Sequence, residues 1–379
     1  MNFELTEEQR AFADSARALF ADTSSDEQWR AHDTSGQPFM QALWRPCVDM
    51  GLHGIVVDEA HGGLGVGMTE LMAVLEAQGR ALALVPLWEH QLVAATVARF
   101  GSAGLASRVL APAMAGDALL TLSMGGVLGA HGPSLSLQPE AGGWRLSGRV
   151  SALPLAAQAS WALLGAACGD TTRLVLLDLR QPGVQRVEGT SQHHQAVADL
   201  HLADLSVNAD AVLDGPAMRW FEPRAMACLA ALQMGVTAEQ LHRTVAYVSE
   251  RRQFGRPVGS FQLVAGQMAD GHIALEALRS ALWQLVYRLD AGLDAQPHAL
   301  ATRVLACELG HRTGHMAQHV HGGMGVDLTY PIHRFLYWSR ALASVLGGAE
   351  PNLARLGDWL ADNDHLGWKY DLPEPDEQP

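Results

Sequence analysis

The chain has 379 residues, 48% of them hydrophobic and 17% charged, which is the composition of a globular protein long enough for two or three domains. Its formal net charge of -14 argues against nucleic acid as a partner, and the lack of an 18-residue stretch free of charges and helix breakers argues against a membrane span. The 4 cysteines are far apart and form no CxxC pair, as in proteins with reduced thiols, so we expect a cytoplasmic location.

Residues 1–118 are expected to form an N-terminal helical domain. Thr6 precedes Gln9 by one helical turn, which is a capping-box pattern, and apolar residues follow at helical spacing. The same periodicity recurs over residues 40–50 and 69–83.

Residues 119–215 have a different pattern. Short apolar runs alternate with turn residues such as the Gly142-Gly143 pair, and this predicts a central β domain built of hairpins. The runs expected to be strands are 119–122, 144–146, 161–167, 173–179 and 212–213.

Residues 216–365 return to helical periodicity and are expected to form a C-terminal four-helix bundle, a fold that often associates through its faces. The first helix carries the apolar positions between Met226 and Val248, and residues 366–379 are an acidic, Pro-rich tail. The other three helices are expected over 261–289, 297–320 and 331–345. The predicted fold class is therefore α+β.

The turn after the first of these helices carries an unusual set of side chains. Arg251 and Gln253 are hydrogen-bond donors, and Phe254 is a large apolar residue in a polar turn that Gly255 and Pro257 keep from being helical. Arginine binds pyrophosphate through two hydrogen bonds and an aromatic ring packs on a flat heterocycle, so this set suits a dinucleotide cofactor. From residue types alone, an ordinary helix–turn–helix corner with solvated arginines is the favoured interpretation.

Three blocks of the sequence resemble the acyl-CoA dehydrogenase family. Glu-Arg-x-x-Phe-Gly-x-Pro at 250–257 is followed by Phe-Gln, His-Val-His-Gly-Gly-Met-Gly-Val-Asp at 319–327 is followed by Tyr-Pro-Ile-His-Arg, and the segment 3–10 is similar to the family's start. The resemblance implies the family's fold, FAD as cofactor, an acyl-CoA thioester as substrate and an electron-transfer flavoprotein as electron acceptor.

In that family a carboxylate removes the α-proton of the thioester while the flavin takes the β-hydride. One family location of this base is a Glu-Gly-Thr-x-Glu block, which reads Leu-Gly-Gly-Ala-Glu here, so Leu346 occupies the position of the base. The other location matches Ala225, which is no carboxylate either. Glu222 lies about one helical turn away and is kept as an alternative base.

The family also implies a flavin bed in the β domain, with Thr-Glu-Pro on one strand and an aromatic-x-Thr motif on another. These segments read Ser-Met-Gly at 123–125 and Ala-Leu-Pro at 152–154, so the expected aromatic wall and hydroxyl donor are missing. The residues that grip the distal half of FAD in a neighbouring subunit are largely kept. Those expected to bind the cofactor are Arg251, Gln253, Phe254, Gln318, His319, Gly322 and Gly323.

This pattern suggests the subunit that lacks the catalytic base in a heterotetrameric, α2β2 acyl-CoA dehydrogenase. A related chain would supply the base and the flavin bed. The C-terminal block is similar to bacterial enzymes of this kind that act on steroid or bile-acid side chains, which implies a role in steroid degradation and lipid metabolism. Two alternatives stay open: an active homotetramer with Glu222 as its base, and a flavin-free scaffold or binding protein on the same fold.

His311, His315 and His319 recur at every fourth position on one face of the expected third helix. Two such histidines bind zinc if a third ligand converges on them. No glutamate completes an HExxH pattern, so we expect a polar interface face and no metal.

Overall fold

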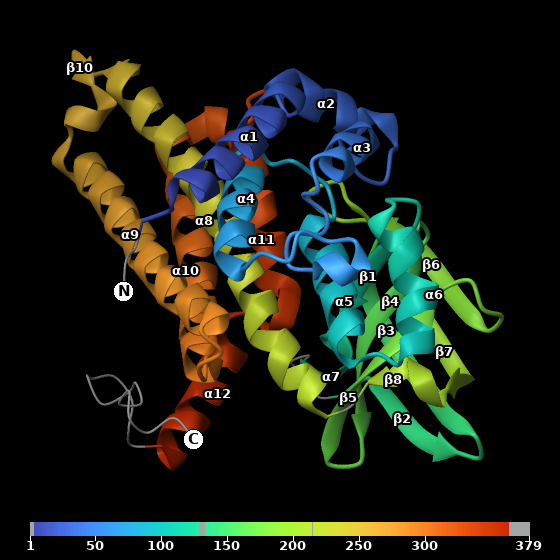
Figure 1. The fold of residues 1–379 in the computed structure, drawn as a ribbon. Helices are drawn as coiled ribbons and strands as arrows, with labels where there is room; N and C mark the ends of the chain where they lie inside the picture. Colours follow the sequence, from blue (N-terminus) through green and yellow to red (C-terminus); the bar gives the residue numbers. More distant parts are fainter. Residues whose placement is uncertain (1–3, 129–132, 214, 364–379) are drawn as a thin grey trace.

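The computed structural model describes residues 4–128, 133–213 and 215–363. Figure 1 shows an N-terminal group of helices, a central sheet and a C-terminal group of long helices, which confirms the predicted α+β fold. The tail predicted over 366–379 lies outside the described residues. Within the described ranges, no helix combines the length and apolarity needed to cross a membrane.

The N-terminal helices begin where the sequence supplies capping residues. The side chain of Thr6 accepts a hydrogen bond from the backbone N–H of Gln9, and the Gln9 side chain accepts one from the N–H of Thr6, so the predicted capping box is present. Ser25 and Gln28 form a second capping box. The helices are α1 (Glu7–Thr23), α2 (Asp26–Ser35), α3 (Gln41–Asp49), α4 (Met68–Arg80), α5 (Leu87–Phe100) and α6 (Ala103–Met114).

The central sheet has 8 strands in the order β6-β7-β3-β2-β4-β5-β8, with β1 pairing in parallel with β4. Three strands, β2, β6 and β7, lie outside the predicted apolar runs, because their residues alternate between exposed and buried or are mostly exposed. The strands are β1 (Leu119–Ser123), β2 (Leu135–Glu140), β3 (Gly143–Pro154), β4 (Ala159–Cys168), β5 (Thr171–Asp178), β6 (Val184–Thr190), β7 (Ala196–Asn208) and β8 (Val212–Leu213).

The C-terminal helices pack around α8, which is buried along most of its length. Gly79 on α4 and Gly235 on α8 allow these two helices to approach closely, because a Cβ atom at either position would overlap the backbone of the other helix. A fifth helix, α12, follows the four predicted ones. The elements are α8 (Pro216–Glu250), β9 (Arg252–Gln253), β10 (Arg256–Pro257), α9 (Gln262–Asp290), α10 (Gln296–His321), α11 (Ile332–Ser344) and α12 (Ala349–Asp362).

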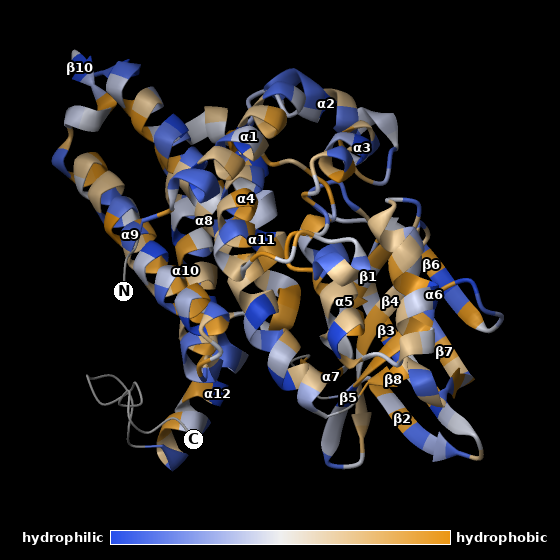
Figure 2. Cartoon of the chain, viewed as in Figure 1, coloured by the Kyte–Doolittle hydropathy of each residue, from blue (hydrophilic) through white to orange (hydrophobic). Residues whose placement is uncertain are grey.

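Two features of this arrangement position the candidate site. Figure 2 shows a hydrophobic interior on β3 and β4, behind α5 and α6, and a hydrophilic tip at β10. The tip projects from the ends of α8 and α9, away from the sheet (Figure 1). Helix α5 lies in the core against β1, α6 and α8, and residues 87–97 are all buried.

Candidate functional site

A cavity of about 580 Å³ lies among the sheet, α5, α8 and α11, and we call it the central cavity. Its wall includes the three segments that the family resemblance assigned to the flavin bed and the catalytic base. These are residues 123–125 at the end of β1, Ala152 and Pro154 on β3, and Leu346 between α11 and α12. Segments that are far apart in the sequence therefore meet at one site.

Leu346 contributes a buried apolar side chain to this wall and is 4% exposed. Its backbone is left-handed, with φ at 53°, and the surrounding turn is held by two side chains. Asn352 donates hydrogen bonds to the carbonyl oxygens of Leu346 (2.7 Å) and Gly348 (2.6 Å), and the buried Arg303 donates to the carbonyl of Leu342 (2.7 Å). The turn is thus well supported, but Leu346 has no group that can accept a proton.

Glu222, the alternative base, lies elsewhere. Its carboxylate accepts two hydrogen bonds from the guanidinium of Arg355, at 2.6 and 2.8 Å, and one from the Gln296 amide at 3.1 Å. The side chain is buried and is not part of the wall of the central cavity. A bidentate pair with arginine occupies both carboxylate oxygens, so Glu222 acts here as a structural link between α8 and α12.

A different carboxyl group lines the central cavity. Glu89, in the first turn of α5, is 6% exposed, and burial raises the pKa of its carboxyl group to about 8. Among the described residues, its Oε2 atom has no hydrogen-bond partner. Sequence reasoning missed Glu89, although a lone acidic residue between the apolar runs at 81–88 and 92–98 was a visible signal.

His193 is the other titratable residue on this wall. Burial lowers the pKa of its imidazole to about 4, and its ring packs edge-on against Trp338 with centroids 5.4 Å apart. At neutral pH His193 is uncharged and Glu89 is mostly protonated. No lysine, arginine or aspartate is among the described residues that line the central cavity. The cavity wall therefore carries almost no formal charge.

The first segment predicted to bind FAD is the β9–β10 hairpin at the outer tip of the C-terminal helices (Figure 1). Arg251 and Gln253 are exposed, and Phe254 is 92% exposed with its backbone left-handed at φ 52°. The guanidinium of Arg256 lies 4.1 Å from the centre of the Phe261 ring, which supports the base of the hairpin. The hairpin thus presents cationic, amide and aromatic groups to the outside.

The second segment lies at the end of α10. His319, Gly322 and Gly323 are exposed, whereas Gln318 is half-buried and its Nε2 atom has no partner among the described residues. A Cβ atom added at either glycine would meet nothing within 4 Å, so crowding inside this chain does not require glycine there. The space beside these residues is open to a ligand or another chain.

An aromatic cluster joins the two segments. The ring of Tyr247 on α8 stacks on that of His321 on α10 with centroids 4.2 Å apart, and Tyr330 lies 5.5 Å from His321. Burial lowers the pKa of His321, so its ring is neutral at physiological pH. Sequence reasoning missed this contact because its partners lie in different motifs.

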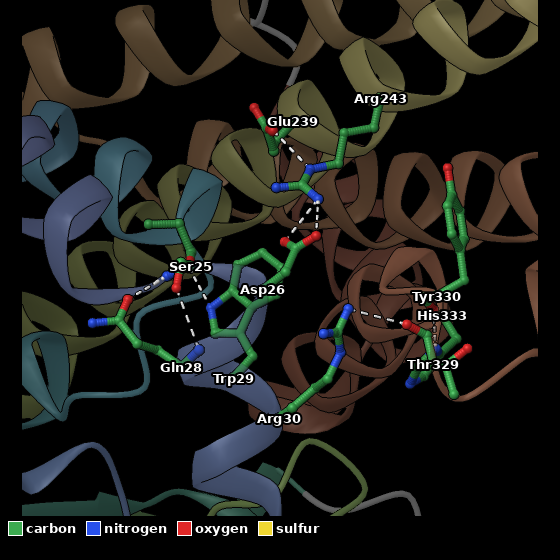
Figure 3. Close-up of polar contacts among 11 residues, drawn as sticks. Ser25, Asp26, Gln28, Trp29, Arg30, Glu239, Arg243, Thr329, Tyr330 and His333 are labelled. Atoms are coloured by element: carbon green, nitrogen blue, oxygen red, sulfur yellow. Dashed lines mark hydrogen bonds and ion pairs between the residues drawn. The ribbon is translucent and has the colours of Figure 1, made fainter.

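A polar crevice of about 420 Å³ lies beside the aromatic cluster. Figure 3 shows the guanidinium of Arg243 between the carboxylates of Asp26 and Glu239, at 3.0 and 2.9 Å. Arg30 donates a hydrogen bond to the carbonyl oxygen of Thr329 (3.2 Å), as Figure 3 also shows. These contacts tie α2 to α8 and to the loop before α11, so the N-terminal helices help to fix the end of α8.

The histidines on the face of α10 form no metal site in the part of the chain that the structure describes. His311 and His315 are in edge-on contact with centroids 4.6 Å apart. No group of three or more potential ligands converges among the described residues.

Comparison with known proteins identifies the family. Residues 6–117 match the model of the acyl-CoA dehydrogenase N-terminal domain, and residues 221–360 match that of the acyl-CoA dehydrogenase C-terminal domain. This chain belongs to the acyl-CoA dehydrogenase family. The dehydrogenases of this family are FAD-dependent oxidoreductases that act on CH–CH bonds, so the predicted family, enzyme class and cofactor are confirmed.

Among curated acyl-CoA dehydrogenases, FadE27 of Mycobacterium tuberculosis is 32% identical over 372 residues, covering 96% of this chain and 99% of FadE27. A variant of the Tcur3481-Tcur3483 steroid ACAD is 36% identical, with a TM-score of 0.88 and coverage of 94% and 98%. The ChsE4-ChsE5 complex of M. tuberculosis has a chain that is 32% identical, with a TM-score of 0.89 and coverage of 96% and 100%.

The two parts of this acyl-CoA dehydrogenase fit FAD unequally. The β9–β10 hairpin and the end of α10 offer exposed Arg251, Gln253 and Phe254, which match a pyrophosphate and a flat ring. The described residues that line the central cavity include no lysine or arginine for a pyrophosphate, and β3 carries Ala152 and Pro154 where an aromatic wall was expected. The tryptophans of the cavity, Trp88 and Trp338, come from helices instead.

Proposed function

We propose that this chain is the subunit without a catalytic base in a heteromeric, FAD-dependent acyl-CoA dehydrogenase. It binds part of the FAD of a related partner chain, which supplies the base and the flavin bed. The observation that carries the proposal is the position of Leu346: an apolar side chain lines the central cavity where the family places its carboxylate. Leu346 cannot remove the α-proton of a thioester, and Glu89, the carboxyl group that does line the cavity, is mostly protonated at neutral pH because burial raises its pKa to about 8.

The exposed hairpin supports a role in a partner's site. Phe254 leaves 92% of its surface in solvent, and a phenylalanine side chain gains about 1.5–3 kcal/mol when it is buried. An exposed ring beside Arg251 is therefore explained by a surface that covers it. On this proposal Arg251 and Gln253 bind the pyrophosphate region of FAD, Phe254 packs against it, and Gln318, His319, Gly322 and Gly323 border the same cofactor.

Exposed apolar residues elsewhere on the C-terminal helices are compatible with a partner chain. Leu263 and Ile273 on α9 are 85% and 66% exposed, and Val326 and Leu328 after α10 are 74% and 69% exposed. A partner chain that packed on these side chains would remove apolar surface from water. Similar chains occur in the ChsE4-ChsE5 complex and the Tcur3481-Tcur3483 enzyme, which supports an α2β2 heterotetramer.

The same relatives support a class of substrate. The Tcur3481-Tcur3483 protein is a steroid ACAD, so we propose a steroid-type side chain, linked to coenzyme A as a thioester, as the substrate. When bound, FAD accepts the hydride, while this chain orients the cofactor and excludes water from its distal half. A cytoplasmic location and an electron-transfer flavoprotein as the electron acceptor complete the proposal.

The two alternatives make different predictions. An active homotetramer with Glu222 as the base requires that residue to reach a thioester, but its carboxylate is paired with Arg355 outside the central cavity. A flavin-free scaffold does not explain why the side chains of Arg251 and Phe254 are exposed. Both alternatives are tested by the activity of defined combinations of chains.

The experiment is thioester oxidation by this chain alone, by a related chain that carries the base, and by the two co-expressed. We expect turnover of a steroid side-chain CoA thioester, followed with a dye acceptor, in the co-expressed complex. Replacing the partner's base by glutamine should abolish turnover, whereas Leu346→Met should leave it within about twofold, because this swap conserves volume and polarity. Turnover by this chain alone would contradict the proposal.

A further inference from the structure

The central cavity has the size of a ligand site in its own right. Its volume of about 580 Å³ lies within the roughly 300–1,000 Å³ typical of small-molecule pockets. Leu84, Leu229 and Leu232 line it together with Trp88 and Trp338. Large apolar side chains on several sides provide a surface for a rigid hydrophobic molecule.

Two described residues that line this cavity have a buried polar atom without a hydrogen-bond partner, the amide of Gln78 and the carboxyl group of Glu89, and only the second can donate a proton from its oxygen. The Glu89 side chain is 6% exposed, and its Oε2 atom is without a partner among the described residues. A buried polar atom that lacks a hydrogen bond destabilises the folded chain, because it has lost its hydration without gaining a partner. A ligand oxygen that accepts a hydrogen bond from this carboxyl group would remove that penalty.

The charge of the wall limits the class of ligand. No lysine, arginine or aspartate is among the described lining residues, and burial keeps His193 neutral by lowering its pKa to about 4. Burial also raises the pKa of Glu89 to about 8, so at neutral pH it donates a proton to a hydrogen bond. A phosphate, a carboxylate or coenzyme A would lose its hydration in this cavity without gaining a counter-charge.

We propose that the central cavity of this chain binds a neutral, rigid ketone or alcohol of polycyclic size, with the ligand oxygen hydrogen-bonded to the carboxyl group of Glu89. The site is separate from the FAD that the β9–β10 hairpin binds for a partner. It goes beyond the proposed function, because it assigns a ligand to the cavity in which Leu346 occupies the expected position of the base.

The binding test uses the purified full chain and the neutral steroid progesterone as the probe. Trp88 and Trp338 line the cavity, so quenching of tryptophan fluorescence, checked by calorimetry, reports occupancy. We expect saturable binding of one progesterone per chain in the micromolar range. Cholate carries a carboxylate on a steroid skeleton that also differs in ring fusion and hydroxylation, and we expect it to bind at least tenfold more weakly.

Three variants locate the site. Glu89→Leu removes the donor and should weaken progesterone binding roughly tenfold, whereas Glu89→Gln keeps an N–H donor and should stay within about threefold. Ser123→Trp narrows the cavity from the end of β1 and should abolish binding. Thermal unfolding identifies any variant that fails to fold. If Glu89→Leu fails to fold, the progesterone affinities of Ser123→Trp and Glu89→Gln still test the proposal.

Two results would overturn the proposal. One is the absence of saturable binding up to the solubility limit of progesterone. The other is binding that Ser123→Trp and Glu89→Leu leave unchanged, or that cholate matches, because the probe would then bind outside the cavity. Neither result bears on FAD sharing, which is measured with a partner chain.

Discussion

The rings of Tyr247 and His321 stack with centroids 4.2 Å apart and join the end of α8 to the end of α10. Arg251 follows the first ring by one helical turn, and Gly322 follows the second directly. The packing of α8 on α10 thus brings together two segments whose roles were inferred from separate motifs, and these two rings are in contact beside them.

Loss of this stack should weaken FAD binding in the complex. We expect Tyr247→Leu to reduce the FAD retained after gel filtration several-fold, since the two segments would no longer be held in register. Its effect on the stability of this chain should be about 1 kcal/mol, the usual contribution of an aromatic pair. Tyr287→Leu, at a partly exposed position on α9, is the control and should retain FAD. Equal FAD content in both variants would show that the stack does not contribute to FAD binding.

The hairpin residues should matter only when a partner is present. Because Arg251 and Phe254 are exposed, Arg251→Ala and Phe254→Ala should leave the melting temperature of the isolated chain unchanged. In the complex we expect each variant to lower FAD content at least fivefold. Arg312→Ala, at an exposed ion pair with Glu308, is the matched control. Normal FAD content in the Arg251→Ala complex would favour the flavin-free scaffold.

Glu89 should make the protein less stable as pH rises. Its folded-state pKa of about 8 exceeds the ordinary value of 4.5, so between these values the folded chain holds a proton that the unfolded chain has released. Unfolding is therefore favoured progressively from pH 4.5 upward, by roughly 3–5 kcal/mol once pH exceeds 8.

The corresponding experiment is thermal unfolding of Glu89→Gln at pH 5 and pH 8. Glutamine is neutral at both values, so we expect the variant to unfold at a higher temperature than the parent at pH 8 and at nearly the same temperature at pH 5. Glu350→Gln, at an exposed position, should show no such difference. An identical shift at both pH values would mean that Glu89 is ionised in the folded chain.

Glu222 should behave as a structural residue. Glu222→Gln removes the negative charge beside Arg355, and we expect a loss of about 1–3 kcal/mol in the free energy of unfolding, because the arginine is one-third exposed and regains water. The folded complex should keep its turnover. A variant that folds with normal FAD content but has lost thioester oxidation would instead identify Glu222 as a base.

The sequence predicted the parts of this fold that repeat a local pattern. Examples are the helix after Thr6, whose buried residues recur at helical spacing, and the strands at 161–167 and 173–179, whose buried residues form short runs. The exposed strand β6 carries no such pattern, whereas α12 has apolar residues at helical spacing, Leu353, Leu356 and Leu360, which were not assigned to a helix from the sequence. Their positions depend on pairing with β7 and packing on α10.

The sequence predicted those residues of the candidate site that lie in motifs resembling the family's. The position of Leu346 follows from a family block, and the structure places it on the wall of the central cavity. Glu89 belongs to no motif, and the buried Oε2 atom that lacks a partner is a consequence of tertiary packing. The contact between Tyr247 and His321 is likewise set by the packing of α8 on α10.

Flavin content per chain shows directly whether this chain shares the FAD of a partner. Absorbance in the flavin band should be measured on this protein alone and on the complex co-purified with a related chain that carries the base. We expect the protein alone to be colourless and the complex to contain about one FAD for each pair of chains. One FAD per chain in the isolated protein would contradict this expectation.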